Sequence, residues 1–239
     1  MEPDAASRCE SYLLQAAAVD ASNPEVYQTL ASVRLSQERH ADARAAVAQS
    51  IQIWKDLEKG ANDPAIPSYE SRINLVKILL ELSQCREALF VLGRLQEEDE
   101  KVVDLWYLFG YTYYLLAVDG ETGELPAAPD NTVSPQFAAD GEGAGCSDPA
   151  AVSPAAAVRL AWDFFRSTLK WHRELDSGDI GILEHTRELM ASIRSVLPDV
   201  EEGEEEEPEE DEDRDEQGTD DGSEWENLSD DEGDDMVDA

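Results

Sequence analysis

The sequence predicts an all-α fold: a solenoid of stacked helical hairpins, closed by capping helices and followed by a disordered acidic tail. Three observations lead to this fold class. Small and large apolar residues recur in a fixed register at three places in the chain. Two of the three starting points, Tyr69 and Val103, lie 34 residues apart, which is the length of one tetratricopeptide repeat. The segment 199–239 carries 24 Asp or Glu residues and one basic residue.

The first repeat is predicted over residues 24–57. Within "NPEVYQTLASVRLSQERHADARAAVAQSIQIW", Asn23 suits a helix N-cap and Pro24 suits the first helical position. Small residues at fixed positions allow the two helices of a hairpin to approach closely. Counted from Pro24, the tetratricopeptide positions 4, 7, 8, 20, 24 and 27 are occupied by Tyr27, Leu30, Ala31, Ala43, Val47 and Ser50. We therefore predict a tetratricopeptide-type α-solenoid, whose first hairpin breaks near Arg39.

The second and third repeats are predicted over residues 69–102 and 103–174. The second has Arg72 at position 4, where the pattern expects a large apolar residue. The third begins with "VDLWYLFGYTYYL" and places four residues in the core: Trp106, Phe109, Gly110 and Tyr113. A Gly- and Pro-rich segment, residues 119–153, interrupts this repeat, and its composition predicts a flexible insertion.

The two ends of the predicted repeat domain, residues 1–198, differ. A helix over residues 178–197 is predicted to cap the solenoid, because terminal repeats need a polar outer face. Cys9, Leu13 and Ala16 fit the second helix of an earlier repeat, whose first helix would precede Met1. Either the chain begins on half a repeat or its N-terminus is truncated, and the unpaired apolar surface favours truncation.

The predicted tail, residues 199–239, has too few apolar residues to offset the entropy of folding, which predicts disorder. Its net charge is −23, within a formal net charge of −37 for the whole chain. Such a charge repels phosphates, so we expect no direct contact with nucleic acid or membrane and a basic partner instead. Ser223 and Ser229 each precede a carboxylate by three residues, as acidophilic kinases require.

The sequence predicts neither catalysis nor a cofactor. Its three His residues have no Cys or carboxylate at metal-ligand spacing, so we expect no metal site, and we expect His185 in "EHTRE" to lie on the surface. No nucleophile with a nearby base is evident. Three widely spaced cysteines indicate a reducing compartment, and no apolar run approaches a membrane span. We expect the protein in the cytoplasm and nucleus.

The candidate binding residues follow from the repeat register. In a tetratricopeptide hairpin, positions 2, 5, 9 and 12 of the first helix line a concave groove. Tyrosines in such a groove can stack on arginine and bond to peptide groups. The predicted binding residues are Glu25, Gln28, Glu70, Ile73, Lys77, Asp104, Tyr107, Tyr111 and Tyr114. The alternative is that the capping helices cover the tyrosines, which would then belong to the core.

Four segments carry a family resemblance: "NPEVYQTLASVRLSQERHADARAAVAQSIQIW", "IPSYESRINLVKILLELSQCREALFVLGRL", "VVDLWYLFGYTYYLL" and "GILEHTREL". With the acidic tail ending "WENLSDDEGDD", they resemble the fungal tetratricopeptide-repeat assembly chaperones dedicated to large-subunit ribosomal protein four. The resemblance implies a chaperone that holds the internal loop of this basic ribosomal protein and escorts it to nuclear pre-ribosome assembly. It further implies a monomer in a one-to-one complex. A histone chaperone and a general tetratricopeptide interaction scaffold stay open as alternatives.

Overall fold

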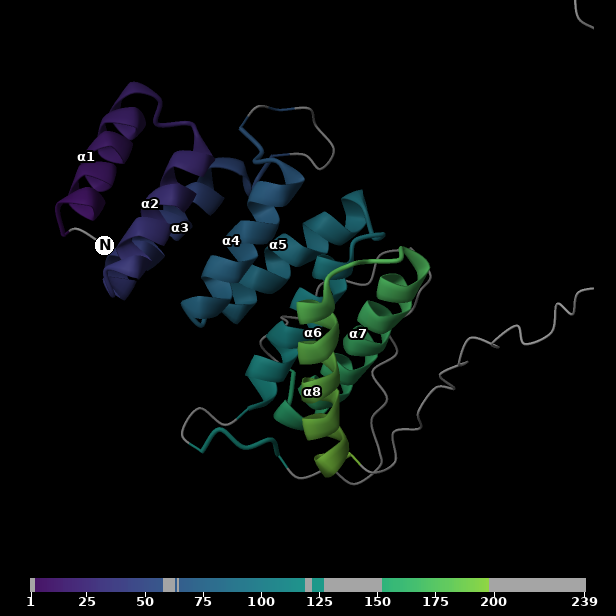
Figure 1. Ribbon diagram of the computed structural model, residues 1–239. Helices are drawn as coiled ribbons and strands as arrows, with labels where there is room; N and C mark the ends of the chain where they lie inside the picture. Colours follow the sequence, from purple (N-terminus) through teal and green to yellow (C-terminus); the bar gives the residue numbers. More distant parts are fainter. Residues whose placement is uncertain (1–2, 58–62, 64, 119–121, 127–151, 198–239) are drawn as a thin grey trace, which may run out of the picture. The chain divides into compact units, whose positions relative to one another are not determined.

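The computed structural model describes residues 3–57, 63, 65–118, 122–126 and 152–197. These residues form helices and turns, with no strand among them (Figure 1). Contacts divide the chain into two units, Met1–Val200 and Glu201–Ala239. The predicted tail with Ser223 and Ser229, and most of the predicted insertion 119–153, lie outside the described residues. The helices are α1 (Pro3–Val19), α2 (Pro24–Ser36), α3 (His40–Trp54), α4 (Tyr69–Glu81), α5 (Cys85–Glu98), α6 (Val103–Ala117), α7 (Pro154–Glu174) and α8 (Ile180–Val196).

The first helix of each hairpin begins at the residue that the repeat register takes as position 1: Pro24, Tyr69 and Val103. Local chemistry explains two of these starts. The side chain of Asn23 accepts a hydrogen bond from the backbone N–H of Glu25 at 3.0 Å. Ser68 does the same for the backbone N–H of Ser71 at 3.2 Å. Side-chain caps thus satisfy backbone donors that a helix leaves unpaired at its start.

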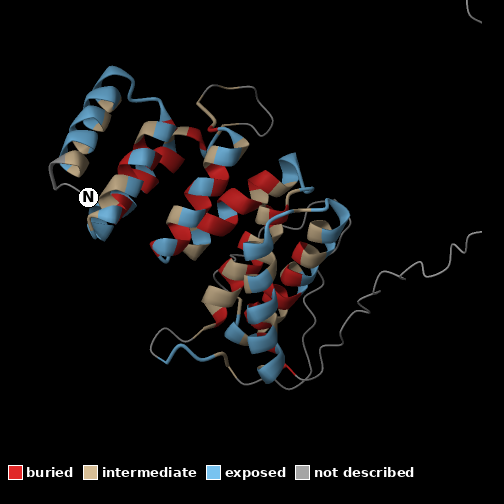
Figure 2. Cartoon of the chain, in the orientation of Figure 1, coloured by how far each residue is buried: buried red, intermediate tan, exposed pale blue. Residues whose placement is uncertain are grey.

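The helices pack as consecutive hairpins, α2 with α3, α4 with α5, and α6 with α7. The first helices also contact one another, α2 with α4 and α4 with α6, and α5 packs against α6. Buried side chains run through α2–α7, whereas α1 has no buried residue among those described (Figure 2). The chain is therefore an all-α, tetratricopeptide-type protein, as the sequence predicts.

Gly110 determines how closely α7 approaches α6. A Cβ atom at this position would lie 2.6 Å from two ring carbons of Phe165, and Phe165 itself is fully buried. No real Cβ contact is that short, so only glycine allows the ring to pack here. The insertion between α6 and α7 does not disturb this packing, because the two helices still meet along their length.

The contacts of Arg72 explain why a basic residue can occupy position 4 of the second repeat. Its side chain is buried, with 4% exposure, and its Nε donates to the carbonyl oxygen of Pro67 at 2.9 Å. Its Nη2 lies 2.6 Å from the carboxylate of Glu98, at the end of α5. The guanidinium thus links both helices of the second hairpin, at a position that is aromatic in the other two repeats.

Trp106 differs from its prediction as a core residue. The side chain is only half-buried, and its Nε1 donates to the carbonyl oxygen of Glu100 at 2.6 Å. Its ring faces Phe164 of α7, with ring centroids 6.0 Å apart. The indole nitrogen needs a polar partner, which holds this edge of the ring near the surface. Phe109, Gly110 and Tyr113 are buried as predicted.

Candidate functional site

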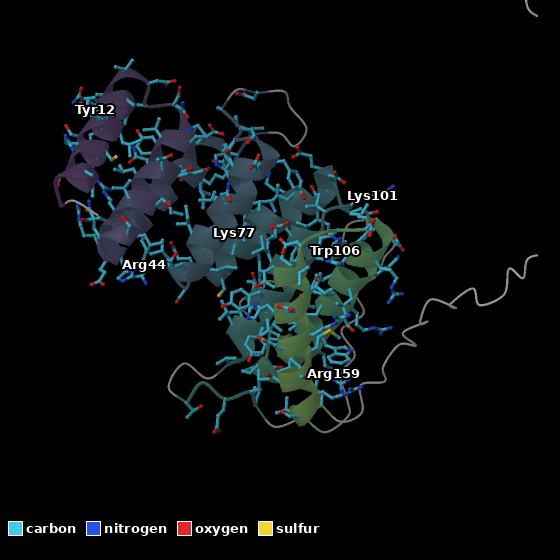
Figure 3. The ribbon with its side chains drawn as sticks, viewed as in Figure 1. Tyr12, Arg44, Lys77, Lys101, Trp106 and Arg159 are labelled. Atoms are coloured by element: carbon cyan, nitrogen blue, oxygen red, sulfur yellow. The ribbon has the colours of Figure 1, made fainter. Side chains whose placement is uncertain are left out.

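The first helices of the hairpins share one face of the molecule. Ser71 of α4 donates a hydrogen bond to the carboxylate of Glu25 on α2 at 2.7 Å. Lys77 of α4 forms an ion pair with Asp104 of α6 at 3.1 Å, and Figure 3 shows Lys77 projecting from α4. These cross-helix contacts bring the predicted binding residues of three hairpins together. We refer to the exposed side of α2, α4 and α6 as the first-helix face.

Two of the nine predicted binding residues do not reach this face. Gln28 and Ile73 are each only 6% exposed, and Ile73 belongs to the hydrophobic core. The amide nitrogen Nε2 of Gln28 has no hydrogen-bond partner among the described residues. Position 5 of the first two repeats is therefore buried and does not form part of the exposed surface. Glu25, Glu70 and Lys77 are exposed.

The tyrosine ladder, Tyr107, Tyr111 and Tyr114, is half-buried on α6. The rings of Tyr107 and Tyr111 stack in parallel, with centroids 6.0 Å apart and an interplanar angle of 5°. Helix α8 adds His185, whose ring packs against both tyrosines at 5.9 and 5.8 Å. The ladder is thus neither an open surface nor core, because one neighbouring helix covers part of it.

A hydrogen bond fixes this contact between α6 and α8. The phenol oxygen of Tyr107 lies 2.7 Å from Nδ1 of His185. Burial, with smaller contributions from Tyr111 and Asp104, raises the pKa of Tyr107 to about 12. The phenol therefore stays protonated near neutral pH and donates to Nδ1 when the neutral imidazole carries its proton on Nε2.

The expectation of a surface position for His185 is wrong. α8 packs against both α6 and α7, which turns His185 toward the tyrosine ladder. The sequence contains a signal for this inward orientation of His185. Leu189, four residues later on the same side of the helix, is buried, and Thr186 and Ile193 are fully buried. An apolar stripe counted through Leu189 places His185 on the inner side of α8.

The charge of the first-helix face is acidic because the nearby arginines are occupied inside the fold. Arg94 of α5 is 7% exposed and donates to the carbonyl oxygens of Trp54, Lys55 and Leu57, at the end of α3. Arg72 is likewise buried. Glu25 and Glu70 are therefore exposed, and Asp104, which is half-exposed, forms an ion pair with Lys77.

Other kinds of site receive little support. A hollow of about 630 Å³ lies between α3, α5 and the end of α6, lined from Arg44 through Leu89 to Leu116, and contains none of the predicted binding residues. Within the described part of the chain, no three His, Cys, Asp or Glu side chains gather as metal ligands would. The described helices also include none with the length and apolar character that crossing a bilayer requires.

Comparisons with known proteins agree with the resemblance read from the sequence. No family model matches the chain. Over 130 residues, 54% of its length, it is 48% identical to a protein of Emericella nidulans named "Probable assembly chaperone of rpl4". Over 119 residues, 49% of its length, it is 37% identical to a protein of Schizosaccharomyces pombe with the same name. These matches cover 33% and 34% of the two relatives, so the chain spans about a third of their length.

A solved structure titled "Assembly Chaperone of RpL4 (Acl4)" also matches, at 42% identity and a TM-score of 0.46. This match covers 48% of the present chain and 40% of the other. The similarity to fungal assembly chaperones of rpl4, expected from the four quoted segments, is confirmed by the two curated relatives.

Proposed function

We propose that this protein is a dedicated chaperone of the basic ribosomal protein rpl4. It binds the internal loop of this client, protects the client from aggregation and escorts it to pre-ribosome assembly in the nucleus. The observation that carries the proposal is the 48% identity over 130 residues with a curated relative whose name gives this role.

The first-helix face supplies suitable chemistry for a basic, extended segment. Carboxylates on three successive helices, Glu25, Glu70 and Asp104, can pair with arginine or lysine side chains of the client. The exposed parts of the tyrosine ladder offer ring faces on which a guanidinium group can stack. Pairs of this exposed kind are weak one by one, so affinity requires several of them together.

Charge also accounts for capture and release. Residues 199–239 carry a net charge of −23, which attracts a basic client over a distance of about one Debye length, roughly 8 Å at physiological salt. Ribosomal RNA is a denser polyanion with a shape complementary to the client. Transfer to RNA is therefore favoured once the pre-ribosome presents its binding site.

Direct binding tests this proposal. The full chain is immobilised and exposed to purified rpl4, to rpl4 without its internal loop, and to histone dimers, each at low and at high salt. We expect rpl4 to bind with its loop and to bind far more weakly without it. A second measurement uses Glu70→Lys, an exposed reversal of charge on α4, which should weaken loop binding while the far-UV circular dichroism spectrum is unchanged.

Three results would contradict the proposal. Equal binding of rpl4 with and without its loop would remove the loop from recognition. Binding of histone dimers as strong as that of rpl4 would favour a histone chaperone. Binding of neither basic protein would leave the general interaction scaffold as the remaining class.

A further inference from the structure

The outer side of α7 carries three arginines at a regular spacing, Arg159, Arg166 and Arg173. Successive members are seven residues apart, close to two helical turns, so they lie on one side of the helix at intervals of roughly 10.5 Å. Arg159, which Figure 3 labels, is half-buried, and Arg166 and Arg173 are exposed. We refer to these three residues as the arginine row.

The arginine row is separate from the first-helix face. Phe165, next to Arg166 in the chain, is fully buried and packs against α6 at Gly110. Val158 and Trp162 are buried on the same side of α7 as Phe165. The row therefore lies on a different side of α7, on the second helix of its hairpin, and a ligand on the first-helix face would leave it uncovered.

The guanidinium groups of the arginine row differ from those of other arginines in the fold. Arg72 and Arg94 are buried and bonded to groups of neighbouring segments, and Arg44 donates to the carbonyl oxygen of Leu82 at 3.1 Å. Within the part of the chain that the structure describes, no side chain of the arginine row forms a hydrogen bond or an ion pair. Three cations with their donor groups directed to solvent are thus available for an external ligand.

One carboxylate lies within the row. Asp163 sits between Arg159 and Arg166 in the helix, and both guanidinium groups act against the burial that raises its pKa. A single aspartate cannot neutralise three arginines, so the row keeps an excess of positive charge. This excess contrasts with the formal net charge of −37 for the whole chain.

We propose that the arginine row binds an acidic helix of a partner protein, with one Asp or Glu side chain opposite each arginine. An α-helix that carries a carboxylate every seven residues repeats at the same interval of roughly 10.5 Å, so two such helices match when they pack nearly parallel or antiparallel. The planar guanidinium group can bind a carboxylate through two parallel hydrogen bonds. This inference goes beyond the proposed function and does not depend on it.

The same observations disfavour nucleic acid as the ligand. A strand of phosphates along the row would pass over Asp163 and be repelled there, and the chain as a whole repels polyanions. A partner helix meets the row with one carboxylate every two turns, and it can place a neutral or basic residue opposite Asp163.

The test uses two triple variants of the full chain with the same change in charge. The row variant replaces all three members of the arginine row by glutamine. The control variant replaces three exposed basic residues outside α7, as Lys55→Gln, Lys101→Gln and Arg187→Gln. Thermal unfolding of both variants is expected within about 2 °C of wild type, because exposed substitutions have small effects on stability.

Fluorescence anisotropy at low salt measures the binding of three labelled probes. The first is a helical peptide with three Glu residues spaced seven apart, the second has the same composition with its Glu residues on different sides of the helix, and the third is single-stranded oligouridylate. We expect wild type to bind the first peptide about 5- to 10-fold more tightly than the second. The row variant should raise Kd for the first peptide by about 10-fold, because three weak exposed pairs are lost together, and the control variant by less than about 2-fold.

Three results would refute the acidic-helix ligand. Absence of binding of the first peptide, or equal binding of the two peptides, would show that the spacing of the row selects no helix. The same Kd in the row variant and the control variant would place binding elsewhere on the chain. Tighter binding of oligouridylate than of the first peptide, lost in the row variant, would make the row a nucleic-acid contact.

Discussion

Arg94 shows how a charged residue can stabilise the junction between two hairpins. Its guanidinium donates to three carbonyl oxygens at the end of α3, at 2.9–3.2 Å, and lies 5.2 Å from the centre of the Trp54 ring. Carbonyl groups at the end of a helix lack partners within the helix, and a cation there also offsets the helix dipole. Burial lowers the pKa of Arg94, and the three hydrogen bonds compensate for this loss of hydration.

Replacing Arg94 by Met should lower the free energy of unfolding by roughly 2–3 kcal/mol. The variant keeps an apolar stem but leaves the three carbonyl oxygens without this donor, and hydrogen bonds to charged groups contribute about 1.5–3 kcal/mol. Urea unfolding followed by circular dichroism measures the change. Arg173→Met, at an exposed position of α7, is the matched control and should change stability by less than about 0.5 kcal/mol. Equal effects of the two changes would contradict the structural role of Arg94.

Gly110 and Gly93 should respond in opposite ways to replacement by alanine. Gly110→Ala should destabilise the protein by roughly 1–2 kcal/mol, because its new methyl group would overlap the ring of Phe165 and overpacking costs more than the helix gains. Gly93→Ala, in the middle of α5, meets no atom within 4 Å and should stabilise by about 0.5–1 kcal/mol. We expect the melting temperature to fall in Gly110→Ala and to rise in Gly93→Ala, each relative to wild type. A stabilising Gly110→Ala would show that α7 can move away from α6 at little cost.

For the helices, the position of α1 on the first hairpin relies largely on one carboxylate, that of Glu10. Glu10 accepts hydrogen bonds from Arg39 and Arg34 at 2.6 and 3.0 Å, and these bonds lower the pKa of its carboxyl group. The rest of α1 is poorly buried, since Tyr12 is 69% and Val19 is 90% exposed. The ion pairs of Glu10 are therefore a major contact between α1 and the first hairpin.

The pH dependence of this contact has a definite sign. A carboxyl group whose pKa is lower in the folded than in the unfolded state stabilises the folded state above the unfolded value, here 4.5. That contribution is lost as the pH falls through the lower, folded pKa. The protection factors of amides in α1, the ratios of intrinsic to observed exchange rate at each pH, should therefore fall below about pH 4.5 before those of α4 and α5 do. Glu10→Gln should lower the same protection factors at neutral pH. Unchanged exchange in this variant would mean that apolar contacts hold α1.

Sequence signals predict helix starts better than they predict contacts between helices. Asn23–Pro24 and Ser68 carry local capping chemistry, which a single sequence shows directly. The burial of Gly110 and Tyr113 can also be predicted from the sequence, because the repeat register is a local pattern as well. The carbonyl bonds of Arg94 join atoms 37–40 residues apart, and no local pattern encodes such a pairing.

The exposure of the first-helix face can be predicted only in part, for a similar physical reason. The repeat register places Glu25, Glu70 and Lys77 at exposed positions, as the structure has them. Gln28 and Ile73 share that register but are buried, because burial depends on contacts with other helices that the position count does not contain. The contact of His185 with Tyr107 crosses 78 residues and an insertion, so it required the structure.

At the scale of the whole molecule, the acidic tail should change the strength of client binding more than its specificity. Deleting residues 199–239 removes a net charge of −23 but no helix of the repeat unit. We expect the deletion to weaken loop binding several-fold at low salt and little at high salt, because diffuse attraction between charges is screened. Calorimetry at both salt concentrations measures this. Loss of all discrimination between rpl4 and histone dimers would instead make the tail the recognition element.

Hydroxyl-radical footprinting of the full chain with and without the rpl4 internal loop would show where this client binds. We expect the loop to protect side chains on the first-helix face, at Tyr107, Tyr111 and Tyr114. Tyr12 on α1 and Phe90 on α5, which are exposed and lie outside this face, should react equally in both samples. Protection of Phe90 or Tyr12 with no change in the tyrosine ladder would refute binding on the first-helix face and place the client on other helices.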